Sequence, residues 1–148
     1  MSRHAFLLAL CGLTVVAAGA ADKVFVGAEV CGQCHGGGHR DQLDTWYRSP
    51  HARAYAVLAL PESAEIARIS GINESPFSNP VCLGCHATAS DVEAWQLDPT
   101  FHIEDGVQCE LCHGPGGGYI AEEIMTDPDA AMAAGLRKPD QRTCMVCH

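Results

Sequence analysis

Four copies of the pattern Cys-x-x-Cys-His constrain what this chain can fold into more than any other feature. In this pattern two cysteine thiols can form thioethers with the vinyl groups of a porphyrin, and the adjacent histidine can bind its iron. The two-residue gap places the cysteines about one helical turn apart, so both sulfurs and the imidazole face one side of the macrocycle. The copies are Cys31-Cys34-His35, Cys82-Cys85-His86, Cys109-Cys112-His113 and Cys144-Cys147-His148. They predict four covalently bound haem c groups, with these eight cysteines as attachment points and these four histidines as proximal ligands.

Zinc ribbons and structural disulfides are the alternative interpretations of paired cysteines. Neither requires a histidine directly after every pair. With 8 His in 148 residues, four such coincidences have odds on the order of one in 10⁵. The remaining cysteine, Cys11, lies in a segment that we expect to be removed. The pattern therefore favours haem attachment.

Residues 1–20 are typical of a secretory signal peptide. Arg3 precedes an apolar run from Ala5 to Ala18, and Ala18-Gly19-Ala20 supplies the small-residue cleavage pattern. The run is short for a membrane span, and a retained anchor is the alternative. We expect residues 21–148 to form a single tetrahaem domain without a membrane span, in the periplasm or secreted outside the cell.

Residues 21–148 must cover four large porphyrins with little protein. The haems are then expected to serve as the core, in a mainly α and loop fold with little conventional hydrophobic core. Removing residues 1–20 leaves 8 Lys and Arg against 18 Asp and Glu, a formal charge of −10. Such an acidic surface argues against nucleic acid and suits redox partner proteins with basic faces.

Local signals predict several short helices and no strand of convincing length. We expect helices over 41–47, 51–60, 61–71 and 128–134, and a loop over 72–80. The segment 92–103 is ambiguous and could be extended. The glycines of 114–118 predict a turn packed against the third haem, where side chains would collide with the ring.

The chain has too few histidines for four bis-His irons. Outside the motifs and residues 1–20 only His39, His51 and His102 remain as distal candidates. His51 is the strongest, because Trp46 lies nearby to pack on a porphyrin. His39 is too close to His35 to bind the opposite face of the same iron.

Three solutions to this shortage remain open. Met125 or Met132 could supply a thioether ligand, although packing within a helix is the favoured explanation of each methionine. Met125 is the methionine that we name as a candidate distal ligand. One iron could instead be five-coordinate and open to a small molecule. A histidine from a neighbouring molecule could also complete it.

With the motifs placed, the chain resembles the cytochrome c-554 family of tetrahaem electron carriers. The most specific stretch is Gly106-Val107-Gln108-Cys109-Glu110-Leu111-Cys112-His113-Gly114-Pro115-Gly116. The segment from Trp46 to His51-Ala52 is similar to the family's Trp segment ending in His-Ala, and the second motif also matches. The resemblance implies an electron shuttle with closely stacked haem pairs, one five-coordinate iron and His51 as a distal ligand. The family's ligand after the third motif would fall near Glu123, where this chain has no histidine.

The leading functional prediction is an electron-transfer protein in which the chain sets haem spacing, ligand type and dielectric, with no catalytic side chain. One alternative is an enzyme whose open iron acts on nitric oxide, hydroxylamine or peroxide. All four motifs end in His rather than the Lys that often marks a catalytic haem, which disfavours that alternative. The other alternative is self-assembly into a polymeric extracellular wire through an intermolecular ligand such as His39.

Overall fold

The computed structural model describes residues 23–38 and 41–148, and within them the chain is mostly helix and loop. The predictions made for residues 1–20 and for His39 lie outside the described residues. The α-helices are short: α1 (Ala28–His35), α2 (Gln42–Tyr47), α3 (Pro61–Ile69), α4 (Pro80–His86), α5 (Cys109–His113), α6 (Glu122–Met125), α7 (Pro128–Ala133) and α8 (Gln141–Cys144). Between them lie the 3₁₀ helices η2 (His51–Arg53), η3 (Ala56–Ala59), η4 (Ala94–Gln96), η5 (Ile103–Asp105) and η6 (Gly116–Gly118). The predicted fold class is confirmed.

The helix starts follow the capping signals in the sequence. Proline is the first residue of α3, α4 and α7, where its fixed φ suits a helix and no amide hydrogen is required. The side chain of Asn79 accepts a hydrogen bond from the Val81 amide at the start of α4 (3.0 Å). The Asp127 carboxylate does the same for the amides of Asp129 and Ala130 in α7. Gly71 and Gly135 follow α3 and α7 with positive φ, as the sequence predicts.

The predicted single helix over 51–60 is wrong, because η2 and η3 divide this segment. In an α-helix the His51 carbonyl would accept from residue 55, but here it accepts from the amides of Ala54 (3.1 Å) and Val107 (3.0 Å). The Ala54 carbonyl is in turn taken by the imidazole of His86 (2.6 Å). Long-range partners therefore occupy the carbonyl groups that a continuous helix would need.

The ambiguous segment 92–103 contains turns, η4 and the start of η5 rather than a strand. In the described residues, β-pairing is limited to one parallel bridge between Phe25 and Leu97. The Phe25 amide donates to the Gln96 carbonyl (2.7 Å), and the Asp98 amide donates to the Phe25 carbonyl (2.9 Å). This bridge fastens the segment before α1 to the loop before α5.

The conventional core is small. One cluster contains the buried residues Leu58, Leu83 and Ala87, with Tyr55 and Ile103 packed against it. Of the ten buried hydrophobic residues in the described part of the chain, four are alanines. Large apolar side chains stay exposed, including Val81 (72%) and Val146 (75%). This sparse core agrees with the prediction of a fold with little hydrophobic core of its own.

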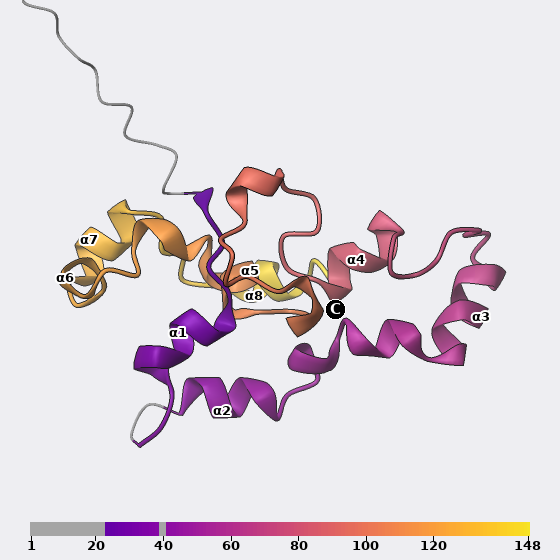
Figure 1. Ribbon diagram of the computed structural model, residues 1–148, viewed down its shortest axis with the longest axis horizontal. Coiled ribbons are helices and arrows are strands. Elements are labelled where there is room, and N and C mark those ends of the chain that lie inside the picture. Colours follow the sequence, from indigo (N-terminus) through magenta and orange to yellow (C-terminus); the bar gives the residue numbers. More distant parts are fainter. Residues whose placement is uncertain (1–22, 39–40) are drawn as a thin grey trace, which may run out of the picture.

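Figure 1 shows the helices spread over an elongated chain rather than wrapped around one centre. Helices α5 and α8 lie in the middle, with α1 and α2 on one side and α3 and α4 extending toward the other. The carboxyl end lies beside α4, and the Cys147 thiol contacts the Gly84 carbonyl there (3.9 Å). Among residues 23–38 and 41–148, no helix has the length and apolar character needed to cross a membrane.

Candidate functional site

The first three motifs lie at the carboxyl ends of their helices. α1, α4 and α5 each end at the motif histidine, so both cysteines lie on the helix and the imidazole projects from its last turn. The fourth motif differs, because α8 ends at Cys144 and leaves Cys147 and His148 beyond it.

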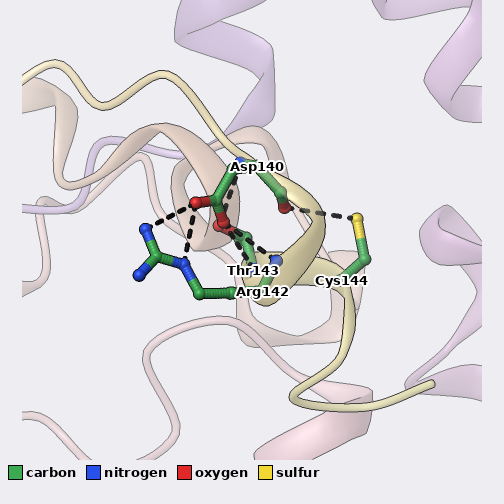
Figure 2. Close-up of polar contacts among 4 residues, drawn as sticks. All are labelled: Asp140, Arg142, Thr143 and Cys144. Carbon is green, nitrogen blue, oxygen red and sulfur yellow. Dashed lines mark hydrogen bonds and ion pairs between the residues drawn. The ribbon is translucent and has the colours of Figure 1, made fainter.

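Asp140 anchors the start of α8. Its carboxylate accepts from the amides of Arg142 (2.9 Å) and Thr143 (3.2 Å), and the Thr143 hydroxyl faces the Asp140 amide in a capping box (Figure 2). The Arg142 guanidinium pairs with the same carboxylate (2.7 Å), and this pairing lowers the pKa of Asp140. The Cys144 thiol contacts the Asp140 carbonyl (3.8 Å). The cap therefore fixes the first cysteine of the fourth motif.

Two motif histidines have one ring nitrogen committed to a backbone carbonyl. Nδ1 of His86 lies 2.6 Å from the Ala54 carbonyl oxygen, and Nδ1 of His113 lies 3.1 Å from that of Arg137. A carbonyl oxygen can only accept, so Nδ1 carries the proton in both rings. Nε2 is then the unprotonated nitrogen, with its lone pair available to a metal. This is the tautomer and orientation that a proximal haem ligand requires.

The motifs meet in pairs that are distant in sequence. The first and third motifs adjoin each other, because α1 contacts α5 and the Cys31 and Cys109 side chains line one cavity. The neighbouring Cys109 thiol raises the pKa of Cys31, and Cys31 in turn lowers the pKa of Cys109. Burial, followed by a hydrogen bond to the Cys85 thiol, raises the pKa of Cys147 to about 11. The second and fourth motifs are also neighbours, because the Cys147 thiol lies 3.9 Å from the carbonyl oxygen of Gly84, which stands between Cys82 and Cys85.

A cavity of about 370 Å³ lies where the first and third motifs meet. Cys31 and His35 line it from α1, and Cys109 and His113 line it from α5. The rest of the wall is Gly32, Gln42, Leu43, Tyr119, Met125, Leu136, Arg137, Lys138 and Pro139. Attachment cysteines, imidazoles, apolar side chains and two cations around one cavity suit a flat apolar ring with anionic propionates. The residues present here fit a haem.

The structure brings His51 to the histidine of the fourth motif. The ring centroids of His51 and His148 are 5.9 Å apart, with the ring planes inclined by 58°. A metal ion between two imidazoles needs a bond of about 2 Å to each ring, and these bonds together with the two ring radii come close to this separation. Of the three distal candidates, His51 is the one that the structure places against a motif histidine within residues 23–38 and 41–148.

The other distal candidates have different surroundings. The His102 side chain is exposed, and its charge partly offsets the raised pKa that burial gives Asp105. Met132 is 39% exposed, whereas Met125 is half-buried and lines the cavity that His35 and His113 share. Met125, but not Met132, thus lines the cavity between these two motif histidines.

Glu110 is a site residue that the sequence analysis missed. It lies between the two cysteines of the third motif and is 1% exposed. Its carboxylate accepts hydrogen bonds from the amides of Val26 (2.9 Å), Gly27 (2.8 Å) and Gly116 (2.6 Å). Burial raises its pKa, and the three amides oppose that shift. A pattern that specifies only the cysteines and histidine gives no signal for this role.

Glu110 also gives the glycines of 114–118 a role within the protein that the sequence analysis did not predict. The turn is present, but a Cβ at Gly116 would lie 2.9 Å from a Val26 methyl and 3.0 Å from the Glu110 carboxylate. Gly114 has φ +84°, and a Cβ there would lie 2.9 Å from the Gly135 carbonyl oxygen. In the described structure these glycines admit neighbouring protein segments.

The eight described cysteines form no disulfide with one another. Among residues 23–38 and 41–148, no three His, Cys, Asp or Glu side chains gather closely enough to hold a metal ion by themselves. Exposed apolar side chains lie inside or directly beside the second and fourth motifs: Val81, Met145 and Val146. A porphyrin attached at these motifs has apolar surface to cover.

Known proteins share this sequence pattern. The family model described as cytochrome c554 and c-prime matches residues 30–114, which include the first three motifs. Cytochrome c-554 of Nitrosomonas europaea is 29% identical over 145 residues, covering 87% of this chain and 59% of the relative. The chain therefore spans less than two thirds of that relative's length. No solved structure matches the chain.

Proposed function

Because the chain belongs to the cytochrome c554 and c-prime family, we propose that it is an electron-transfer protein that carries four covalent haem c groups and passes single electrons between them. The observation that carries this proposal is the pairwise proximity of the four motifs: the first and third line one cavity, and Cys147 of the fourth contacts Gly84 inside the second. Haem, when bound, supplies the one-electron chemistry. The chain supplies attachment, axial ligands and spacing.

The proximal ligands in this proposal are His35, His86, His113 and His148. The carbonyls of Ala54 and Arg137 orient two of these rings by accepting from Nδ1. Such a hydrogen bond raises the electron density of the imidazole and so favours the oxidised metal. These two backbone groups therefore help to set the potentials.

The distal ligand of the fourth motif's iron is His51 in this proposal. The 5.9 Å separation of its ring from that of His148 supports the assignment. For an iron in the cavity shared by the first and third motifs, Met125 is the proposed thioether ligand, because its side chain lines that cavity. A thioether raises the potential of a haem relative to a second imidazole. His39 and His102 remain distal candidates for the other irons.

The chain is proposed to be exported, with residues 1–20 removed as a signal peptide. Residues 21–148 would then act as one domain in the periplasm or outside the cell. The proposed partners are redox proteins with basic faces, because the acidic surface would speed their encounter.

The proposal is tested by counting haems in the purified protein and recording its ferric electron paramagnetic resonance spectrum. We expect four haems per chain from the pyridine haemochrome assay, and a mature mass that begins near Ala21. Fewer than four haems would contradict the tetrahaem proposal. Low-spin signals alone would support a carrier. A high-spin signal amounting to one haem would favour the enzyme alternative, to be tested with nitric oxide, hydroxylamine or peroxide.

The methionine ligand has its own test. In Met125→Leu we expect loss of the charge-transfer absorption that ferric iron shows with a thioether ligand, and a lower potential for one haem. Met132→Leu is the matched control, because Met132 does not line the cavity. Equal spectra for wild type and Met125→Leu would rule Met125 out as a ligand.

A further inference from the structure

The turn that contains η2 has two separate contacts with motif histidines. At its first residue, the His51 ring lies 5.9 Å from the ring of His148. Immediately after the 3₁₀ helix, the Ala54 carbonyl accepts from Nδ1 of His86 (2.6 Å). A side chain and a carbonyl three residues apart thus contact the fourth and the second motif.

A second loop holds this turn in place. The Val107 amide donates to the His51 carbonyl (3.0 Å), and the Trp46 indole donates to the Val107 carbonyl (2.7 Å). The neighbouring Gly106 carbonyl accepts from the Thr88 amide (2.9 Å), two residues after His86. Residues 106–107 therefore join the turn to the end of the second motif.

The approach of this loop depends on a glycine. Gly106 is buried with φ +76°, and a Cβ there would lie 2.7 Å from the His51 carbonyl oxygen and 3.2 Å from the Ala54 amide nitrogen. Both atoms belong to the backbone of the turn, so a side chain at 106 could be accommodated only by moving the turn.

We propose that the turn over residues 51–54 is a shared positioning element for the second and fourth haems, held in register by Trp46 and Gly106. The inference rests on the proposed function, because it takes His51 as the fourth iron's distal ligand and His86 as the second iron's proximal ligand. Displacing the turn changes two distances together: the separation of the His51 and His148 rings, and the hydrogen bond between His86 and the Ala54 carbonyl. Trp46 and Gly106 are positioning residues, since they act through the turn.

The test is electron paramagnetic resonance with a redox titration of holoprotein variants. His51→Ala identifies the fourth haem by its conversion to high spin, and His86→Met identifies the second by its changed signal. We expect Gly106→Ala to convert part of the fourth haem's low-spin signal to high spin and to shift the g-values and potential of the second. The other two haems keep wild-type signals.

Gly71→Ala is the matched control for Gly106→Ala. Gly71 has nearly the same φ (+74°) but no atom within 4 Å of an added Cβ. The Gly71→Ala substitution therefore introduces similar backbone strain without touching a haem ligand, and we expect wild-type haem signals. If Gly106→Ala does not fold, Trp46→Phe keeps an aromatic ring but removes the indole N–H that donates to the Val107 carbonyl, and it should give the same paired change. Trp95→Phe, at a side chain that is 58% exposed, is its control.

Paired changes at the second and fourth haems, absent in both controls, support the shared element. A change confined to one haem, or none at either, overturns it. Unchanged signals in His51→Ala would overturn the inference by removing His51 as a ligand, while a count of four haems in the wild type would leave the proposed function standing.

Discussion

At the scale of single residues, the haem attachment points could be predicted from sequence but their supports could not. Cysteines and histidines at fixed spacing carry a covalent requirement, so the pattern alone specifies them. Glu110 occupies one of the two positions between the cysteines of the third motif, where the pattern allows any residue. Its role comes from three amides on residues as distant as Val26, and only the fold reveals such contacts.

We expect Glu110→Gln to lower the free energy of unfolding by about 1–3 kcal/mol, because a buried amide cannot replace a carboxylate that accepts from three amides. The measurement is denaturant unfolding of the holoprotein. Glu123→Gln is the matched control, at an exposed position in α6. A loss below about 0.5 kcal/mol would show that the three hydrogen bonds to the Glu110 carboxylate contribute little to stability.

Asp140 gives an acid-dependent prediction. Because Arg142 lowers its pKa below the usual 3.8, the cap is fully present above that value and is lost as pH falls through the lowered one. Asn at this position also caps a helix but does not titrate. We expect amide-exchange protection at Arg142 and Thr143 to fall as the pH drops below 3.8 in the wild type but not in Asp140→Asn. Parallel pH profiles would count against this role.

At the scale of elements, local signals were sufficient where a helix is closed by its own caps. The Pro and Gly residues around 61–71 and 128–135 predicted α3 and α7 correctly. The failure at 51–60 has a physical cause, because the His51 and Ala54 carbonyls bind partners 56 and 32 residues away. Sequence reasoning could name His51 as a ligand candidate, but it could not pair it with His148.

At the scale of elements, we predict that the Asn79 cap stabilises α4. Asn79→Ala removes the side chain that accepts from the Val81 amide, and we expect a loss of about 0.5–2 kcal/mol in stability. α4 carries the second motif, so the second haem's signal should broaden first on heating. Asn73→Ala, in the loop before α4, is the control and should unfold like the wild type. Identical melting of the two variants would contradict this role of the cap.

At the scale of the whole molecule, the sequence correctly predicted that the chain would have little core of its own. A domain of this size normally buries enough apolar surface to offset its conformational entropy. Here the main buried cluster is built on Leu58, Leu83 and Ala87, and large apolar side chains beside the motifs face outward. Groups attached at the motifs must therefore supply much of the buried surface.

Removing haem should consequently unfold the chain. We expect residues 21–148, produced without haem attachment and kept reduced, to lack a cooperative thermal transition in far-ultraviolet circular dichroism, whereas the holoprotein shows one. The reason is that the attached porphyrins add apolar surface that folding buries, and that folding brings distant side chains to their irons as axial ligands. A chain with the first motif's cysteines replaced, Cys31→Ala with Cys34→Ala, should lie between these extremes, since it loses contacts in the cavity that α1 shares with α5. A cooperative transition in the haem-free chain would mean that the small cluster around Leu58 is sufficient, and that the haems occupy a fold that already exists.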